Sequence, residues 1–219
     1  MWKATPDARF HMTERSGGAH PTLVVRFTRA ERALHWIYAL LFLALLATGL
    51  ALWVPSLSIV VGERALLRRV HIICGVALVA LPLAVAVLGG RRMRATLLDI
   101  DQFDRDDWAF LRRRPATSGR FNGGQKANTI WTVTAGGLFF VSGVVQWQWS
   151  RFPMAWRTGS SELHDLLTIV SAVVVLGHVY LATINPSTRH STRGIIAGTV
   201  RRDWALRHHP AWLRDEPPA

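Results

Sequence analysis

The stretch Leu163-HDLLTIVSAVVVLGHVYLA-Thr183 is the part of the chain that decides its fold. It is almost entirely apolar, and as a helix it is long enough to cross about 30 Å of hydrocarbon. It also carries His164 and His178, which are fourteen residues apart. That spacing is about 3.9 turns and roughly 21 Å of α-helix, so both imidazoles leave one face of the helix at two depths of a bilayer.

Three further apolar runs surround this one, and half of the 219 residues are hydrophobic. A membrane protein is therefore the expected class. We predict an all-α membrane protein, a bundle of four transmembrane helices, with short interfacial helices at Leu97–Leu111 and Gly194–His208. The other three predicted spans are Ala33–Val54, Val70–Leu88 and Ala127–Trp147.

The distribution of positive charge predicts the topology. With four spans, the N-terminal arm, the middle loop and the C-terminal tail share one side and carry 21 of the 26 Lys and Arg residues. Because cytoplasmic loops are enriched in Lys and Arg, both termini of this multi-pass membrane protein are expected in the cytoplasm. The net charge of +12 is thus a topology signal, and no nucleic-acid partner is expected. The predicted organisation is a flexible arm (1–25), a transmembrane domain (26–213) and a tail (214–219).

Four of the nine histidines lie in or at the rim of the predicted spans, where an ionisable side chain is costly enough to suggest function. The topology sorts these four into two pairs by depth: His35 with His178 on the cytoplasmic side, and His71 with His164 outside. The other five are expected on solvated surfaces; they are His11, His20, His190, His208 and His209.

Each pair suits the two axial positions of a haem iron, because neutral imidazole is a good iron ligand and two of them leave electron transfer as the chemistry. The chain has a single cysteine, Cys74, and no Cys-x-x-Cys-His motif for covalent haem attachment. The alternative for any one histidine is a simple hydrogen bond at the membrane boundary. Arginines near the ligands are candidate partners of haem propionates: Arg32, Arg68 and Arg69.

The segment between the middle loop and the third span is a candidate quinone site. Asn122, Gln125 and Lys126 offer polar groups to a quinone carbonyl, and Gly123-Gly124 allows close backbone approach. The alternative is that these residues only begin a helix and anchor it.

Several motifs resemble the cytochrome b (gamma) subunit of membrane-bound formate dehydrogenases, over about residues 24–213. They are Phe27-TRAERALH-Trp36, Arg120-FNGGQ-Lys126, His178-Val-Tyr180 and the ending Gly194…Gly198…Trp204…His208-His209-Pro210-Ala211-Trp212.

The resemblance implies a protein of the bacterial inner membrane with two b-type haems, one on His71 and His164 and one on His35 and His178. It also implies electrons arriving from an iron–sulfur beta subunit on the outer side, beside a molybdenum or tungsten alpha subunit. Menaquinone or ubiquinone would be reduced near the cytoplasmic haem, with Asn122, Gly124, Gln125 and His178 as candidate contacts. No catalytic residue is expected here, because the formate chemistry would belong to the alpha subunit.

Two alternatives stay open. The first is that the chain is the cytochrome b subunit of a nickel–iron hydrogenase or another respiratory reductase, because such a subunit would use the same four-helix arrangement. A haem-free membrane anchor, embedded in lipid with histidines that only donate and accept hydrogen bonds, is the second.

Overall fold

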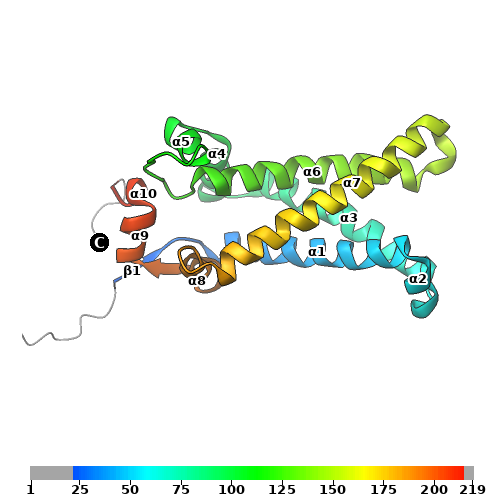
Figure 1. The fold of residues 1–219 in the computed structure, drawn as a ribbon, viewed down its shortest axis with the longest axis horizontal. Coiled ribbons are helices and arrows are strands. Elements are labelled where there is room, and N and C mark those ends of the chain that lie inside the picture. Colours follow the sequence, from blue (N-terminus) through cyan, green and yellow to red (C-terminus); the bar gives the residue numbers. More distant parts are fainter. Residues whose placement is uncertain (1–21, 215–219) are drawn as a thin grey trace, which may run out of the picture.

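Long helices dominate the computed structural model, which describes residues 22–214. Within that range four helices are long and apolar enough to cross a membrane, so the predicted all-α, four-helix membrane class is confirmed (Figure 1). Each of these four helices begins before the span predicted from hydropathy, because its opening turns consist of charged or polar residues that precede the apolar stretch. They are α1 (Arg29–Trp53), α3 (Arg64–Leu88), α6 (Gly123–Trp147) and α7 (Met154–Val179), the last continued by the π-helical turn η2 (Tyr180–Ile184).

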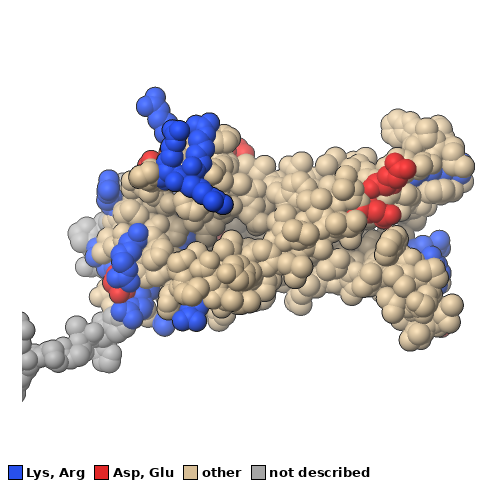
Figure 2. Space-filling model, viewed as in Figure 1, with Lys and Arg blue, Asp and Glu red and all other residues tan. Residues whose placement is uncertain are grey.

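The four spans pack as two pairs, α1 against α3 and α6 against α7, and α3 joins the pairs by contacting α6. One end of the bundle carries α2 (Pro55–Val61) and the 3₁₀ turn η1 (Trp149–Arg151), and we call it the α2 end. The other carries a two-stranded ribbon, and we call it the ribbon end. Figure 2 shows Lys and Arg gathered at the ends and a middle belt without charge, as a bilayer-spanning bundle requires.

The ribbon joins the two ends of the described chain. β1 (Leu23–Val25) pairs antiparallel with β2 (Thr199–Arg201), with Val24 opposite Val200. The prediction of a flexible arm over residues 1–25 was therefore wrong for its last three residues; residues 1–21 lie outside the described part. This pairing fixes the chain entering α1 against the chain that follows the last span.

The single helix expected at Gly194–His208 is divided in the structure. Gly198 has a φ of +84°, which ends the first helix in a left-handed conformation that suits glycine. A Cβ there would lie 3.0 Å from the carbonyl oxygen of Phe27. Val200, Trp204, Ala205 and Trp212 form a small buried core around these pieces. The pieces are η3 (Arg189–Ser191), α8 (Thr192–Ala197), β2, α9 (Arg202–His208) and α10 (Pro210–Arg214).

The expected interfacial helix Leu97–Leu111 is likewise two helices, α4 (Arg91–Asp101) and α5 (Arg105–Leu111). Asp104 separates them. Its side chain accepts a hydrogen bond from the backbone N–H of Asp107, and the Asp107 side chain accepts one from the N–H of Asp104. This capping box starts a new helix and thereby ends the continuous one predicted from the apolar pattern.

A buried ion pair ties α5 to α6. The Lys126 ammonium lies 2.7 Å from the Asp107 carboxylate and also donates to the carbonyl oxygen of Gln102. Gly123 makes this approach possible, since a Cβ at that position would collide with the Asp107 backbone. The backbone of Gly123 therefore makes the expected close approach, and the segment that it approaches is α5.

Asp107→Ala should lower the thermal midpoint of the purified protein, because it leaves the Lys126 ammonium buried without its anion. Removing one partner of such a pair costs about 3–5 kcal/mol. Asp107→Ala/Lys126→Met, which removes both charges, should recover most of the loss. If the double variant is no more stable than the single one, the pair does not hold α5 in place.

Candidate functional site

The four histidines expected in the spans meet as two pairs in the structure. The ring centres of His35 and His178 are 6.2 Å apart, and those of His71 and His164 are 6.3 Å apart. The first pair lies toward the ribbon end and the second toward the α2 end, which is the sorting expected from depth. Histidines from three helices thus face one another at two levels of the bundle.

This separation fits haem. With a metal–imidazole bond of about 2.0 Å, two imidazoles on one metal ion have ring centres about 6 Å apart. No cluster of three or more His, Cys, Asp or Glu side chains that could bind a bare metal ion exists among residues 22–214. Two facing histidines per level are a complete donor set for a six-coordinate haem iron, and too small for a closed zinc site.

A hydroxyl group contacts each histidine of the α2-end pair. The Thr48 hydroxyl on α1 lies 2.9 Å from Nδ1 of His71, and the Ser142 hydroxyl on α6 lies 2.9 Å from Nδ1 of His164. With both Nδ1 atoms engaged, each Nε2 is the nitrogen left for a metal.

A glycine follows each of these hydroxyl residues and also faces the ligand ring. A Cβ at Gly49 would lie 3.3 Å from Cε1 of His71, and one at Gly143 would lie 3.7 Å from Cε1 of His164. We name Thr48-Gly49 and Ser142-Gly143 the hydroxyl–glycine pairs. These two hydroxyls were not among the predicted site residues. The signal that could have found them is a Thr-Gly and a Ser-Gly inside two apolar spans, at the depth of His71 and His164.

The arginines expected near propionates occupy two different settings. Arg32 donates from Nε to the carbonyl oxygen of Ile195 and from Nη2 to that of Ile196. Its guanidinium therefore closes the C-terminal end of α8, where carbonyl groups lack helical partners. Arg68 and Arg69 lie exposed in the opening turns of α3, at the α2 end.

The candidate quinone residues form the start of α6 at the ribbon end. Asn122 caps the helix through a hydrogen bond from the Gln125 N–H, and the Gln125 side chain accepts one from the Asn122 N–H. Asn122, Gly124 and Gln125 remain partly exposed. Lys126 is buried in its pair with Asp107, so its ammonium already has an anionic partner.

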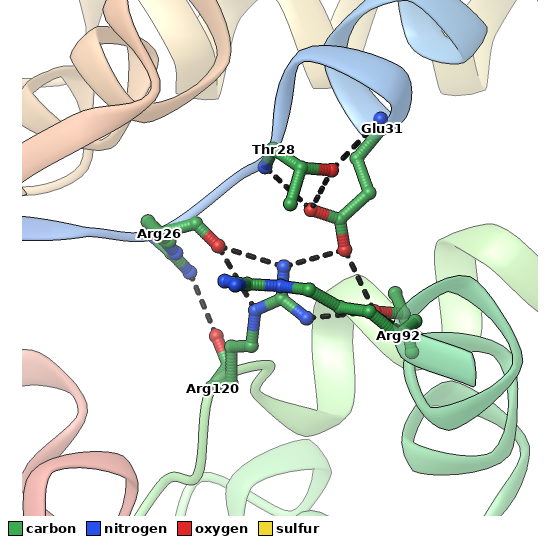
Figure 3. Close-up of polar contacts among 6 residues, drawn as sticks. Arg26, Thr28, Glu31, Arg92 and Arg120 are labelled. Atoms are coloured by element: carbon green, nitrogen blue, oxygen red, sulfur yellow. Dashed lines mark hydrogen bonds and ion pairs between the residues drawn. The ribbon is translucent and has the colours of Figure 1, made fainter. Parts of the chain in front are cut away.

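A polar cluster at the ribbon end connects this segment to α1 (Figure 3). Arg120 binds the Glu31 carboxylate at 2.6 Å and the Thr96 hydroxyl at 2.8 Å. Arg26 and Arg120 also exchange contacts: each guanidinium donates to the other residue's carbonyl oxygen. Glu31 lies one turn before His35, so the cluster joins the entry of α1 to the candidate quinone segment.

His209 completes the cluster and was wrongly expected on a solvated surface. It is 2% exposed, its Nδ1 lies 2.7 Å from the carbonyl oxygen of Gly119, and its Nε2 lies 3.1 Å from Nη2 of Arg26. The carbonyl can only accept, so Nδ1 carries the proton and Nε2 accepts from Arg26. Burial, followed by the charge of Arg26, lowers the pKa of His209 to about 3. Burial and then Arg120 lower the pKa of Arg26 to about 10, which leaves it cationic at neutral pH.

Comparison with known proteins identifies a family match over most of the chain. The sequence profile described as prokaryotic cytochrome b561 matches residues 26–198. The chain is 29% identical over 206 residues to the formate dehydrogenase cytochrome b556(fdo) subunit of Escherichia coli strain K12, covering 88% of this chain and 92% of the relative.

Two further relatives carry similar names. The nitrate-inducible formate dehydrogenase cytochrome b556(Fdn) subunit of the same strain is 26% identical over 208 residues, covering 88% of this chain and 91% of that protein. The formate dehydrogenase cytochrome b556 subunit of Haemophilus influenzae is 26% identical over 209 residues, covering 90% and 85%. These relatives match this chain over nearly their whole length.

His209 should make stability depend on pH. Its pKa is about 3 in the folded protein and about 6.5 when unfolded, so its stabilising effect is complete above pH 6.5 and is lost as pH falls towards 3. The loss is about 1.4 kcal/mol per pH unit in that window. The thermal midpoint should therefore fall less steeply between pH 7 and 5 in His209→Gln, whose amide can keep both contacts. His190→Gln, an exposed control, should match the wild-type slope; equal slopes for all three proteins would contradict the assignment.

Gly49→Ala should disturb only the α2-end pair, because its methyl group would press on the ring of His71. We expect reduced haem content or a shifted absorbance maximum for one haem in the purified protein. Gly137→Ala is the matched control, since a Cβ there would meet nothing within 4 Å. An unchanged spectrum in Gly49→Ala would show that the ring of His71 has room to move.

Proposed function

The chain belongs to the prokaryotic cytochrome b561 family, and on that premise we propose that it is the membrane-anchoring, di-haem cytochrome b subunit of a formate dehydrogenase. The observation that carries this proposal is the pair of facing histidines at each of two levels. His71 and His164 would hold one haem b, and His35 and His178 the other. The two imidazoles of each pair would hold the haem iron, and a haem held in this way would supply one-electron transfer rather than oxygen chemistry.

In this proposal the ribbon end faces the cytoplasm of a bacterium and the α2 end faces outward. The support is charge: among residues 22–214, 18 of the 23 Lys and Arg residues lie in segments at the ribbon end. The chain would then carry electrons inward, from an iron–sulfur subunit docked at the α2 end towards a quinone at the ribbon end. A molybdenum or tungsten subunit bound to the iron–sulfur subunit would oxidise the formate.

The quinone, menaquinone or ubiquinone, would bind beside the start of α6 and His178. The partly exposed side chains of Asn122 and Gln125 offer an amide donor and acceptor to its carbonyls, with Gly124 giving access to the backbone. Lys126 would hold the segment against α5 through Asp107 rather than reach the quinone. Arg120 and Glu31 would keep this segment in place relative to His35.

The propionates of the two haems need cationic or donor partners. Arg68 and Arg69 are proposed for the α2-end haem, because both stand exposed in the turn before His71. Arg32 is proposed for the ribbon-end haem. Its guanidinium would bind a propionate through the N–H groups that it does not donate to α8.

Substitution of single histidines tests the pairing. His35→Ala and His178→Ala should each remove the same haem, and His71→Ala and His164→Ala the other, as measured by redox difference spectra and haem quantification. His190→Ala, at an exposed histidine, should leave two haems per chain. A crossed pattern of loss would refute the depth assignment.

Affinity purification from the native host tests the complex. Iron–sulfur and molybdenum or tungsten subunits should co-purify with the chain and reduce its haems when formate is added. A nickel–iron partner would assign the chain to a hydrogenase instead. A purified chain with no reducible haem absorbance would establish a haem-free anchor and overturn the proposal.

A further inference from the structure

The two hydroxyl–glycine pairs make the same contact to the two histidines of the α2-end pair, although they belong to different helices. Thr48 of α1 contacts His71 of α3, and Ser142 of α6 contacts His164 of α7. The same Nδ1 atom is contacted in both cases, at the same distance of 2.9 Å. Two independent helices thus supply the same chemical group to two ligands of the same pair.

The hydrogen-bond network assigns a direction to these contacts. The Thr48 hydroxyl also lies 2.7 Å from the carbonyl oxygen of Ala44, and the Ser142 hydroxyl lies 2.8 Å from that of Leu138. A carbonyl can only accept, and a hydroxyl has one proton, so that proton is given to the helix backbone. Each hydroxyl oxygen therefore accepts from the imidazole, which places the histidine proton on Nδ1 and the free lone pair on Nε2.

From this geometry we propose that Thr48 and Ser142 are positioning residues for the haem at the α2 end: they fix the tautomer and angle of both axial ligands and hold the reduction potential of that haem down. The proposal rests on the haem assignment made above. A hydrogen bond accepted from the far nitrogen of a ligating imidazole makes the ligand a stronger electron donor. Stronger donation favours ferric over ferrous iron, and a lower potential follows.

The glycines explain why the hydroxyls can approach the rings. Gly49 and Gly143 follow Thr48 and Ser142 directly, and a Cβ at either would touch Cε1 of the ligand. The imidazole therefore lies against the bare backbone of the glycine while its Nδ1 reaches the neighbouring hydroxyl. The contact with the glycine and the hydrogen bond to the hydroxyl together fix the orientation of each imidazole ring.

The ribbon-end pair lacks this arrangement. Within residues 22–214, neither His35 nor His178 has a ring hydrogen bond to another residue. Loss of the hydroxyls should therefore act on one haem and spare the other.

The test is a spectroelectrochemical titration of the purified, haem-loaded complex, with Thr48→Val and Ser142→Ala singly and together. One of the two haem potentials should shift to more positive values in each variant and further in the double variant, while the second stays at its wild-type value. Thr48→Ser, which restores the hydroxyl, should return the first potential to the wild-type value. Thr183→Val is the matched control, because the exposed Thr183 hydroxyl makes the same bond to its own helix backbone without reaching a histidine.

Electron paramagnetic resonance of the oxidised complex provides a second readout. Two low-spin, bis-histidine signals should persist, with only one of them altered in the variants. A positioning role would also be supported if the Thr48→Val complex lost one haem while the Thr48→Ser complex kept both. Unmoved potentials with both haems bound, a shift of the other haem, or a Thr48→Ser that behaves like Thr48→Val would overturn the inference and leave the cytochrome assignment standing. A wild-type complex that does not hold two haems would instead overturn the cytochrome proposal itself.

Discussion

The separation of about 6 Å between facing imidazoles is the constraint on which the rest of this structure depends. Two histidines can share one metal ion only if their helices keep a fixed register and rotation. In lipid the hydrophobic effect does little for this, because a lipid tail is as apolar as a neighbouring helix. The register has to come from close packing and from polar contacts between helices, and the two ends of the bundle obtain them in different ways.

At the ribbon end the contacts are ionic and lie outside the apolar belt. Arg120 joins Glu31 of α1 to Thr96 of α4, just before α6 begins, and the pairing of β1 with β2 ties the entry of α1 to the chain after α7. These groups can be charged because they lie near water, where an ion pair costs less to form. The same contacts that support His35 therefore also support the candidate quinone segment, and the two cannot move independently.

Toward the α2 end the candidate ligands are themselves the polar links between helices. His71 connects α3 to α1 through Thr48, and His164 connects α7 to α6 through Ser142. Neutral hydroxyls suit this depth, since a serine or threonine in an apolar helix satisfies its proton on its own backbone. A charged partner would have to be desolvated there. Binding of a haem would then lock contacts that the free protein already makes.

The sequence by itself determined the four spans, the side on which charge accumulates and the sorting of the histidines by depth. Hydropathy, charge and helical spacing are local properties, and a rigid helix carries them unchanged into three dimensions. It also identified the residues at the start of α6, although not that Lys126 is held by Asp107. Only the tertiary structure decided that His209 is buried, that Arg26 and Arg120 exchange contacts across 94 positions of sequence, and that Thr48 and Ser142 reach the imidazoles. Those contacts depend on how helices distant in sequence rotate and approach one another, and no periodicity within a single helix encodes that.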